Sequence, residues 1–282
     1  MSIELRRPQP EHVAELGRIC YEAFRDIAES HGFPPDFDSI EFAQGVVGLL
    51  MQQETVYSVA AFDDGVPRGS NFLNMWGDVA GVGPISVDLT AQGEGIGKQL
   101  MQNTLDHAKK QNFDMVRLCQ DSFNMRSLAL YASLGFDVQE PLAYLTLAAG
   151  PVDVAFRPAT PADYDAMDAL CRDVYRISRK GEYAALAAAG FPAFVLDRGR
   201  ITGYLIGTAI GHGVAESDDD MLALLAGIGA STPDAHAHIA MRQGELYRRS
   251  LAAGHRNRKV MNLMSYGPYE APQGTYCASV MF

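Results

Sequence analysis

The stretch Gln92-Gly93-Glu94-Gly95-Ile96-Gly97-Lys98 carries residue types that can bind a phosphorylated ligand. It follows a predicted strand at 79–88 and opens a predicted amphipathic helix at 96–110. Glycine lets a backbone turn sharply and approach a ligand closely. The first turn of a helix adds unpaired N–H groups and the positive end of a dipole. A strand, a glycine turn and a helix in this order therefore predict a site for a diphosphate.

The spacing of these glycines excludes two common nucleotide sites. A P-loop needs Gly, four residues and then Gly-Lys-Ser/Thr, but Gln92 and Gln99 stand at the first and last of those positions. The dinucleotide pattern G-x-G-x-x-G fails as well, because Gly93, Gly95 and Gly97 are separated by single residues. The pattern that remains is Gln-x-x-Gly-x-Gly.

A second motif lies downstream, after one predicted helix and one predicted strand at 114–120. It is Asn124-Met125-Arg126-Ser127-Leu128-Ala129-Leu130-Tyr131, and the helix it begins ends in Gly135-Phe136. Together the two motifs resemble the GNAT superfamily of acyl-CoA-dependent N-acetyltransferases. The first motif of that family is Gln/Arg-x-x-Gly-x-Gly/Ala, and the second is Asn-x-x-Ala/Ser-x-x-x-Tyr ending in Gly-Phe. The motifs cover about residues 80–138, and the layout matches over nearly the whole chain.

The resemblance implies that acetyl-CoA is the co-substrate and that backbone amides around the first motif grip its pyrophosphate. No metal is implied. The cofactor-binding residues that follow from the resemblance are Ile85, Ser86, Val87, Gln92, Gly93, Glu94, Gly95, Ile96, Gly97, Lys98, Asn124, Ser127 and Tyr131.

The pair Gly83-Pro84 interrupts the predicted strand before the glycine loop. Proline cannot donate to a central ladder and marks edges and bulges. A bulge would splay this strand from the one at 114–120 and free a backbone N–H group. In the family an amide here polarises the thioester carbonyl, and Val87 N–H is the best match. An edge strand with an incidental proline is the alternative.

Tyr131 matches the family tyrosine near the thioester sulfur, which implies that it acts as the general acid toward the departing thiolate. It could instead simply pack on the core face of its helix. Asn124 also has two interpretations. It can cap the predicted helix 125–133, which Gly135 would end, and the family adds a hydrogen bond from Asn124 to the cofactor.

The general base is the least determined role. Asp78 and Asp88 bracket the proposed binding strand, and Asp88 can equally cap the turn into the glycine loop. His31 lies in an aromatic loop between the first two predicted helices, where the family tends to bind acceptors. A neutral imidazole suits proton transfer near pH 7. The catalytic candidates are therefore Tyr131, Asp88 and His31.

The chain repeats one order of elements, which predicts two domains. Arg7-Pro8 before a helix recurs as Arg157-Pro158, and the turn pattern Asp-x-Gly-x-x-x-Gly starts at Asp63 and again at Asp197. The coarse order of strands and helices predicts an α/β fold, with a mixed twisted sheet flanked by helices. We expect a catalytic GNAT domain at 1–149 and a degenerate GNAT-like domain at 150–282, with the break near 148–151.

The second copy lacks the glycine pattern. The helix at 244–251 and the strand at 259–264 are expected to correspond to the cofactor helix and the strand after it, with a single glycine before them. We therefore expect no productive acyl-CoA binding there, and a role in shaping the acceptor site or in a dimer contact. Ser217 is expected to cap a helix at 218–226. The tyrosine-rich loop 266–276 could form an acceptor wall or a dimer contact.

Composition limits the partners. A net charge of −11 argues against nucleic acid and mildly favours a cationic acceptor. The sequence has no stretch long and apolar enough to cross a membrane and no apolar signal core. Four scattered cysteines and the His236-x-His238 pair match no disulfide or zinc pattern. The simplest prediction is a cytoplasmic protein without a metal, and a homodimer is possible.

These features predict an acyltransferase that moves groups other than amino-acyl groups. The expected reaction is acetyl transfer to a primary amine of a small molecule or peptide, by direct attack, since no nucleophile with a partnered base is evident in the sequence. One alternative is a non-catalytic acyl-CoA-binding sensor that signals through the second copy. Another is transfer of a different acyl group, or transfer to oxygen.

Overall fold

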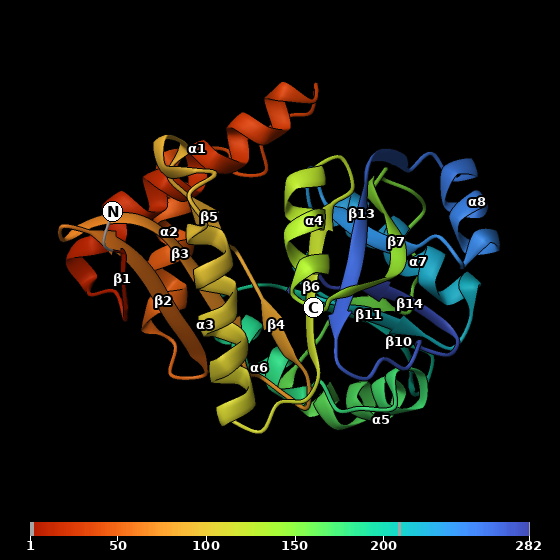
Figure 1. Ribbon diagram of the computed structural model, residues 1–282. Helices are drawn as coiled ribbons and strands as arrows, with labels where there is room; N and C mark the ends of the chain where they lie inside the picture. The colour runs from red at the N-terminus through yellow and green to blue at the C-terminus, as the bar shows by residue number, and fades with distance from the viewer. Residues whose placement is uncertain (1–2, 208–209, 282) are drawn as a thin grey trace. The chain divides into compact units, whose positions relative to one another are not determined.

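The computed structural model describes residues 3–207 and 210–281, and the chain divides into two compact units (Figure 1). The first unit holds residues up to 75 together with 79–117 and 123–137. The second holds 76–78, 118–122 and the chain from 138 onward. The predicted break at 148–151 lies within the second unit.

The first unit follows the predicted order of elements. Its helices are α1 (Val13–Ser30), α2 (Ile40–Gln52), α3 (Ile96–Lys110) and α4 (Met125–Ser133), with short turns η1 (Pro10–His12) and η2 (Leu89–Ala91). Its strands are β1 (Ile3–Arg6), β2 (Val56–Asp63), β3 (Val66–Asn74), β4 (Ala80–Val82), β5 (Ser86–Val87) and the first two residues of β6 (Val116–Asp121). The sequence predicted α3 and α4 with these same bounds.

The sheet of the first unit runs β1-β2-β3-β4, and β5 is an additional partner of β3. All its ladders are antiparallel except that of β4 with β6, which is parallel at Ala80 and Gly81. The sheet is therefore mixed, as predicted. Val59 of β2 packs with Ile96 and Leu100 of α3 on one face, so the core of this unit fixes the helix that begins at the glycine loop.

The second unit contains four helices among its described residues: α5 (Tyr164–Tyr175), α6 (Lys180–Ala188), α7 (Asp218–Ser231) and α8 (Gly244–Ala252). Its remaining elements are η3 (Pro161–Asp163) and the strands β7 (Asp137–Thr146), β8 (Phe156–Pro158), β9 (Ala193–Asp197), β10 (Ile201–Ile206), β11 (Gly213–Ala215), β12 (His236–Ala240), β13 (Arg256–Tyr266) and β14 (Thr275–Ala278). The strands are ordered β13-β7-β12-β14-β11-β10-β9-β8. Two apolar clusters lie in this unit, one including Met167 of α5 and Leu186 of α6, the other Leu225 of α7 and Leu246 of α8.

The order of elements repeats, but not with the correspondence expected from the sequence. In the first unit α3 follows β4 and β5 and leads into β6, and in the second α7 follows β11 and leads into β12. The counterpart of α3 is therefore α7, and α8 corresponds to α4. The expectation that the helix at 244–251 matches the cofactor helix was wrong, because the short strands β11 and β12 lack a clear periodicity in the sequence.

The tyrosine-rich loop after β13 is fastened within the second unit. Tyr276 Oη donates to Glu140 Oε2 at 2.5 Å, and Tyr269 Oη donates to the other oxygen of Glu140. Arg242 Nε donates to Tyr276 Oη at 3.0 Å. These bonds give the two tyrosines a structural role.

Among the described residues, no helix is both long and apolar enough to span a bilayer. No group of three or more side chains with metal-binding chemistry occurs in that part of the chain either.

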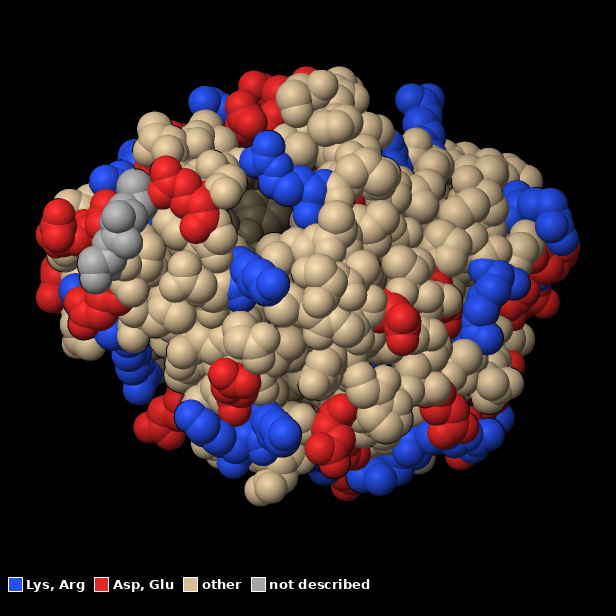
Figure 2. Space-filling view, viewed as in Figure 1, with Lys and Arg blue, Asp and Glu red and all other residues tan. Residues whose placement is uncertain are grey.

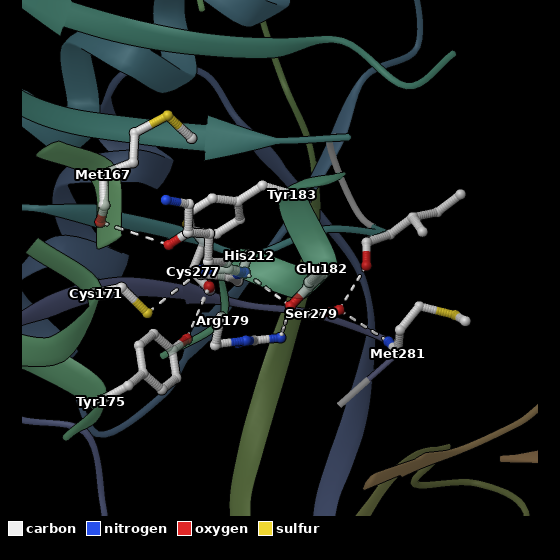
Figure 3. A network of polar contacts seen from close by, with 12 residues as sticks. Met167, Cys171, Tyr175, Arg179, Glu182, Tyr183, His212, Cys277, Ser279 and Met281 are labelled. Atoms are coloured by element: carbon white, nitrogen blue, oxygen red, sulfur yellow. Dashed lines mark hydrogen bonds and ion pairs between the residues drawn. The ribbon is translucent and has the colours of Figure 1, made fainter. Parts of the chain in front are cut away.

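A buried polar network lies in the core of the second unit (Figure 3). Glu182 Oε2 lies 2.6 Å from Arg179 Nη2 and 3.1 Å from His212 Nδ1. His212 Nε2 is 2.8 Å from Tyr204 Oη, which in turn is 2.9 Å from Tyr183 Oη. Burial and the charge of Arg179 lower the pKa of His212 to about 4, although Glu182 opposes this shift. His212 is therefore neutral at pH 7.

This network predicts a loss of stability in acid. The folded state binds the His212 proton more weakly than the unfolded chain, whose histidine pKa is about 6.5. The stabilisation is fully present above pH 6.5 and is lost as the pH falls toward 4, by on the order of 2–3 kcal/mol. Urea unfolding between pH 7.5 and 4.5 should show this slope in the wild type and in the exposed-site control His31→Gln. The slope should become shallower in His212→Gln, where His107 and His255, whose pKa values burial also lowers, still contribute. An unchanged slope in that variant would contradict the assignment.

Candidate active site

The strand before the glycine loop is interrupted, as its proline predicted. Leu73 of β3 is paired with Val82 of β4, whereas Ser70 is paired with Ser86 of β5. Residues 83–85 thus stand opposite only two residues of β3, 71 and 72. This one extra residue defines a β-bulge. Pro84 falls within the bulge, where it deprives no ladder of a donor. The single predicted strand at 79–88 is therefore two short strands.

The bulge sets the direction of the Val87 backbone. Val87 is opposite Gly69, and the next residue, Asp88, donates its N–H group to Arg68 O at 2.9 Å. Hydrogen-bonded and non-hydrogen-bonded pairs alternate along an antiparallel ladder. Val87 and Gly69 are therefore a non-hydrogen-bonded pair, and the N–H and C=O groups of Val87 both point away from β3. A side chain at Gly69 would meet Ser86 O at 2.4 Å, so this close pairing requires glycine.

The glycine loop turns through backbone conformations that favour glycine. Gly93 has φ +91° and Gly95, the N-cap of α3, has φ +83°. A Cβ atom at either position would meet no protein atom within 4 Å. No side chain caps α3, and its first turn contains no acidic residue. No carboxylate of the first turn therefore competes for the N–H groups at this helix start, which is an arrangement that favours an anion.

The other residues of the loop divide between core and surface. Ile96 is buried against Leu100, so only its N–H group can serve a ligand. Gly97 has helical geometry, and a Cβ there would make ordinary contacts with Leu130 and Val87. The side chains of Glu94 and Lys98 are exposed, and Lys98 adds a positive charge to the first turn.

The side chain of Gln92 is used within the protein. Its Nε2 donates to Val87 O at 3.2 Å, and its Oε1 accepts from Arg126 Nη1 at 2.6 Å. Gln92 thus satisfies the outward C=O group of Val87 and leaves its outward N–H group without a bond from Gln92. Arg126 was not among the predicted site residues, although its charge inside the second motif was a visible signal.

Asn124 and Ser127 form the start of α4. Asn124 Oδ1 accepts from Ser127 N at 3.1 Å, and Ser127 Oγ donates to Asn124 O at 3.0 Å. The structure thus shows the capping role of Asn124. Its Nδ2 has no partner among the described residues, so this donor is available to a ligand.

Tyr131 lies on α4 and is 6% exposed, with its ring centroid 6.0 Å from that of Phe136. Burial raises the pKa of Tyr131 well above its ordinary value. The phenol therefore stays protonated at neutral pH, although the shift also makes it a weaker acid. No hydrogen-bond partner of its hydroxyl occurs in residues 3–207 or 210–281.

The two aspartates considered as the general base, Asp88 and Asp78, lie in different surroundings. Asp88 Oδ1 accepts from the amide and the hydroxyl of Thr90, and its Oδ2 lies 3.2 Å from Arg18 Nη2. Burial raises the pKa of Asp88, but the hydrogen bonds from Thr90 and Arg18 outweigh it and lower the pKa overall. A carboxylate held in this way is a poor proton acceptor. Asp78 is exposed and belongs to the second unit.

His31 is exposed at the end of α1 and stacks on Phe123, the residue before Asn124. Its Nδ1 lies 2.9 Å from Ile27 O. Nδ1 also lies 3.1 Å from Ser30 Oγ. In the tautomer that donates from Nδ1 to the Ile27 carbonyl, Nε2 carries the lone pair. Phe33 also stacks on Phe123, with 4.5 Å between the ring centroids. The two stacked rings hold this loop against the start of α4.

The face that carries α3 and α4 contains a hollow with lysine or arginine side chains at its rim (Figure 2). The structure thus combines an open glycine loop, an uncapped helix, an outward amide and a protonated phenol in the first unit. These features fit a ligand that carries a diphosphate and, on the same molecule, an arm with a hydrogen-bond acceptor.

Comparison with known proteins assigns the first unit. The profile described as the Acetyltransferase (GNAT) family matches residues 15–136. The chain therefore contains a GNAT-family acetyltransferase domain. The match includes the glycine loop and the helix that bears Tyr131, and it makes this domain an acyltransferase. A search of curated proteins found no match.

Solved structures agree on the fold over almost the whole chain. A candidate acetyltransferase from Pyrococcus horikoshii is 15% identical, with a TM-score of 0.77 over 95% of this chain and 90% of its own. A GCN5-related N-acetyltransferase from Sphaerobacter thermophilus is 16% identical, with a TM-score of 0.62 over 97% of this chain and 98% of its own. At these identities the likeness concerns the fold alone.

The capping role of Asn124 is testable by stability. Replacing Asn124 with alanine removes the oxygen that accepts from Ser127 N and should lower the free energy of unfolding by about 1 kcal/mol. Asn124→Ser keeps a capping oxygen and should stay within a few tenths of a kcal/mol of the wild type. Urea unfolding followed by circular dichroism measures both. Equal stability of the alanine and serine variants would show that the cap contributes nothing.

Proposed function

We propose that the first unit is an N-acetyltransferase that moves the acetyl group of acetyl-CoA to a primary amine by direct attack. The observation that carries the proposal is the outward N–H group of Val87, which lies beside the open glycine loop. A donor in that position suits a thioester carbonyl, and the loop suits a diphosphate on the same molecule.

The fit of acetyl-CoA rests on groups that the protein does not use itself. Gly93 and Gly95 leave open space, and α3 begins without a cap or an acidic residue. The N–H groups at 95–98 would hold the diphosphate, and Val87 N–H with Asn124 Nδ2 would orient the pantetheine end. Acetyl-CoA would supply a thioester whose acyl carbon bonds to the amine while the C–S bond breaks.

The proposed proton transfers use two residues. Nε2 of His31 accepts the proton that the attacking amine loses, in the tautomer that carries the ring proton on Nδ1 beside Ile27 O. Tyr131 donates its phenolic proton to the departing sulfur. The raised pKa of the phenol makes it a weaker acid, so this transfer is uphill, and the phenolate regains its proton from water once the thiol has left. Asp88 is the weaker candidate for the base, since Thr90 and Arg18 hold its carboxylate.

The acceptor is proposed to be an amine of a small molecule or peptide. A net charge of −11 supports a cationic acceptor and disfavours nucleic acid. A role of the second unit toward the acceptor, or in a dimer, stays a prediction from the sequence.

The second unit is proposed to hold no acyl-CoA. Whereas β4 pairs directly with β6 in the first unit, their counterparts β11 and β12 are both paired with β14, which lies between them. The start of α7 is capped by Ser217 and carries Asp218, Asp219 and Asp220. In the second unit a further strand therefore lies between the counterparts of β4 and β6, and the counterpart of α3 begins with a cap and three acidic residues.

Substitution of Tyr131 tests the proposed reaction. Tyr131→Phe removes the proton donor and should lower kcat by about 10²- to 10⁴-fold on the best acceptor of an amine panel. Affinity for coenzyme A should change little, because the ring is kept. Thiol release measures turnover, and Tyr57→Phe, the same change on β2, serves as control. Tight coenzyme A binding with no thiol release from the wild type on any acceptor would instead favour a sensor.

Binding stoichiometry tests the assignment of the two units. Isothermal titration calorimetry with coenzyme A should give one site per chain. Gly95→Ala should abolish or greatly weaken that site, because a side chain is strained at φ +83° and its methyl group enters the space over the loop. Gly199→Ala, at another turn with φ +84°, is the matched control and should bind normally. Two equivalent sites per chain would refute the role given to β14.

A further inference from the structure

Arg126 differs in its partner from three other arginines of the first unit. Arg6, Arg18 and Arg25 each lie within 4.0 Å of a carboxylate. The partner that the described residues provide for Arg126 is instead the neutral amide of Gln92, at 2.6 Å. Arg126 is also exposed, so most of its five N–H donors and its full charge are available.

The bond to Gln92 places this guanidinium at the glycine loop. Gln92 precedes Gly93 directly, and its other amide atom is bonded to Val87 O. Arg126 itself stands in the first turn of α4. The side chain of Gln92 thus joins the glycine loop to β5 and to the start of α4. It orients the guanidinium of Arg126 without a carboxylate that would cancel the charge.

A planar guanidinium with free donors binds phosphate oxygens in a bidentate manner. Because both polar atoms of the Gln92 side chain are already bonded within the protein, Gln92 has little left to offer a phosphate. We infer that Arg126 is a phosphate ligand of the acyl-CoA cofactor and that Gln92 is its positioning residue. This inference rests on the proposed function of the first unit.

Two phosphate groups of coenzyme A could be the contact: the diphosphate and the 3′-phosphate of the ribose. The diphosphate is expected at the start of α3, and Arg126 is held beside the same loop. Either contact satisfies the inference, and a comparison of coenzyme A with its 3′-dephospho analogue separates them.

The test is the affinity of Arg126→Gln for three ligands. Calorimetry with coenzyme A should show a dissociation constant about 10- to 100-fold above that of the wild type, as expected for loss of a charge-assisted contact. The dissociation constant of pantetheine, which has no phosphate, should change by less than about 2-fold in an NMR titration. If the loss persists with dephospho-coenzyme A, the contact is to the diphosphate; if it disappears, the contact is to the 3′-phosphate.

Two further variants act as controls. Lys109→Gln removes an exposed positive charge at the far end of α3 and should leave coenzyme A affinity unchanged. Arg126→Lys keeps the charge without the fork and should recover part of the affinity. Thermal unfolding should be the same for all variants, because Arg126 is exposed.

Two results would overturn the inference while the proposed function stands: a wild-type affinity for coenzyme A in Arg126→Gln, or an equal loss for coenzyme A and pantetheine. The second would mean that Arg126 only supports the local fold. A wild-type protein that does not bind coenzyme A would overturn the proposed function itself.

Discussion

The extra residue between β4 and β5 decides which backbone groups of the first unit remain available to a ligand. Without it, the register at Leu73 and Val82 would continue, and Val87 would exchange hydrogen bonds with β3. With it, Val87 turns its polar groups outward, and Gln92 bonds one of them. The direction of a single amide thus depends on a one-residue shift that glycine at 69 makes sterically possible.

The two units handle the same structural problem, the free N–H groups at a helix start, in opposite ways. At α7, Ser217 accepts from the N–H group of Asp220, and three aspartates in the first turn favour the positive end of the helix dipole. At α3 neither a cap nor an acid is present, and glycines replace side chains over the turn. The start of α7 is stabilised by the protein's own residues. The start of α3 lacks this stabilisation, and an anionic ligand could provide it.

Local signals allowed much of the first unit to be predicted. The bounds of α3 and α4 follow from a glycine turn, an asparagine cap and regular apolar spacing, all of which act within a few residues. The bulge was expected from Pro84. The roles of Gln92 and Asp88 were harder to predict, because their partners Arg126 and Arg18 lie 34 and 70 residues away in the chain. The position of β14 between β11 and β12 is likewise a non-local pairing that a short strand after a proline-rich loop does not reveal.

The bond from Gln92 to the carbonyl of Val87 has a consequence for solubility as well. An interrupted strand with unsatisfied polar groups is a template on which another extended chain can assemble, and such edges promote aggregation. A new strand needs alternating donors and acceptors, and the side-chain amide has removed the acceptor at this position. The free N–H group of Val87 can still donate to a ligand, but without a free carbonyl beside it this edge cannot form a regular ladder with another polypeptide.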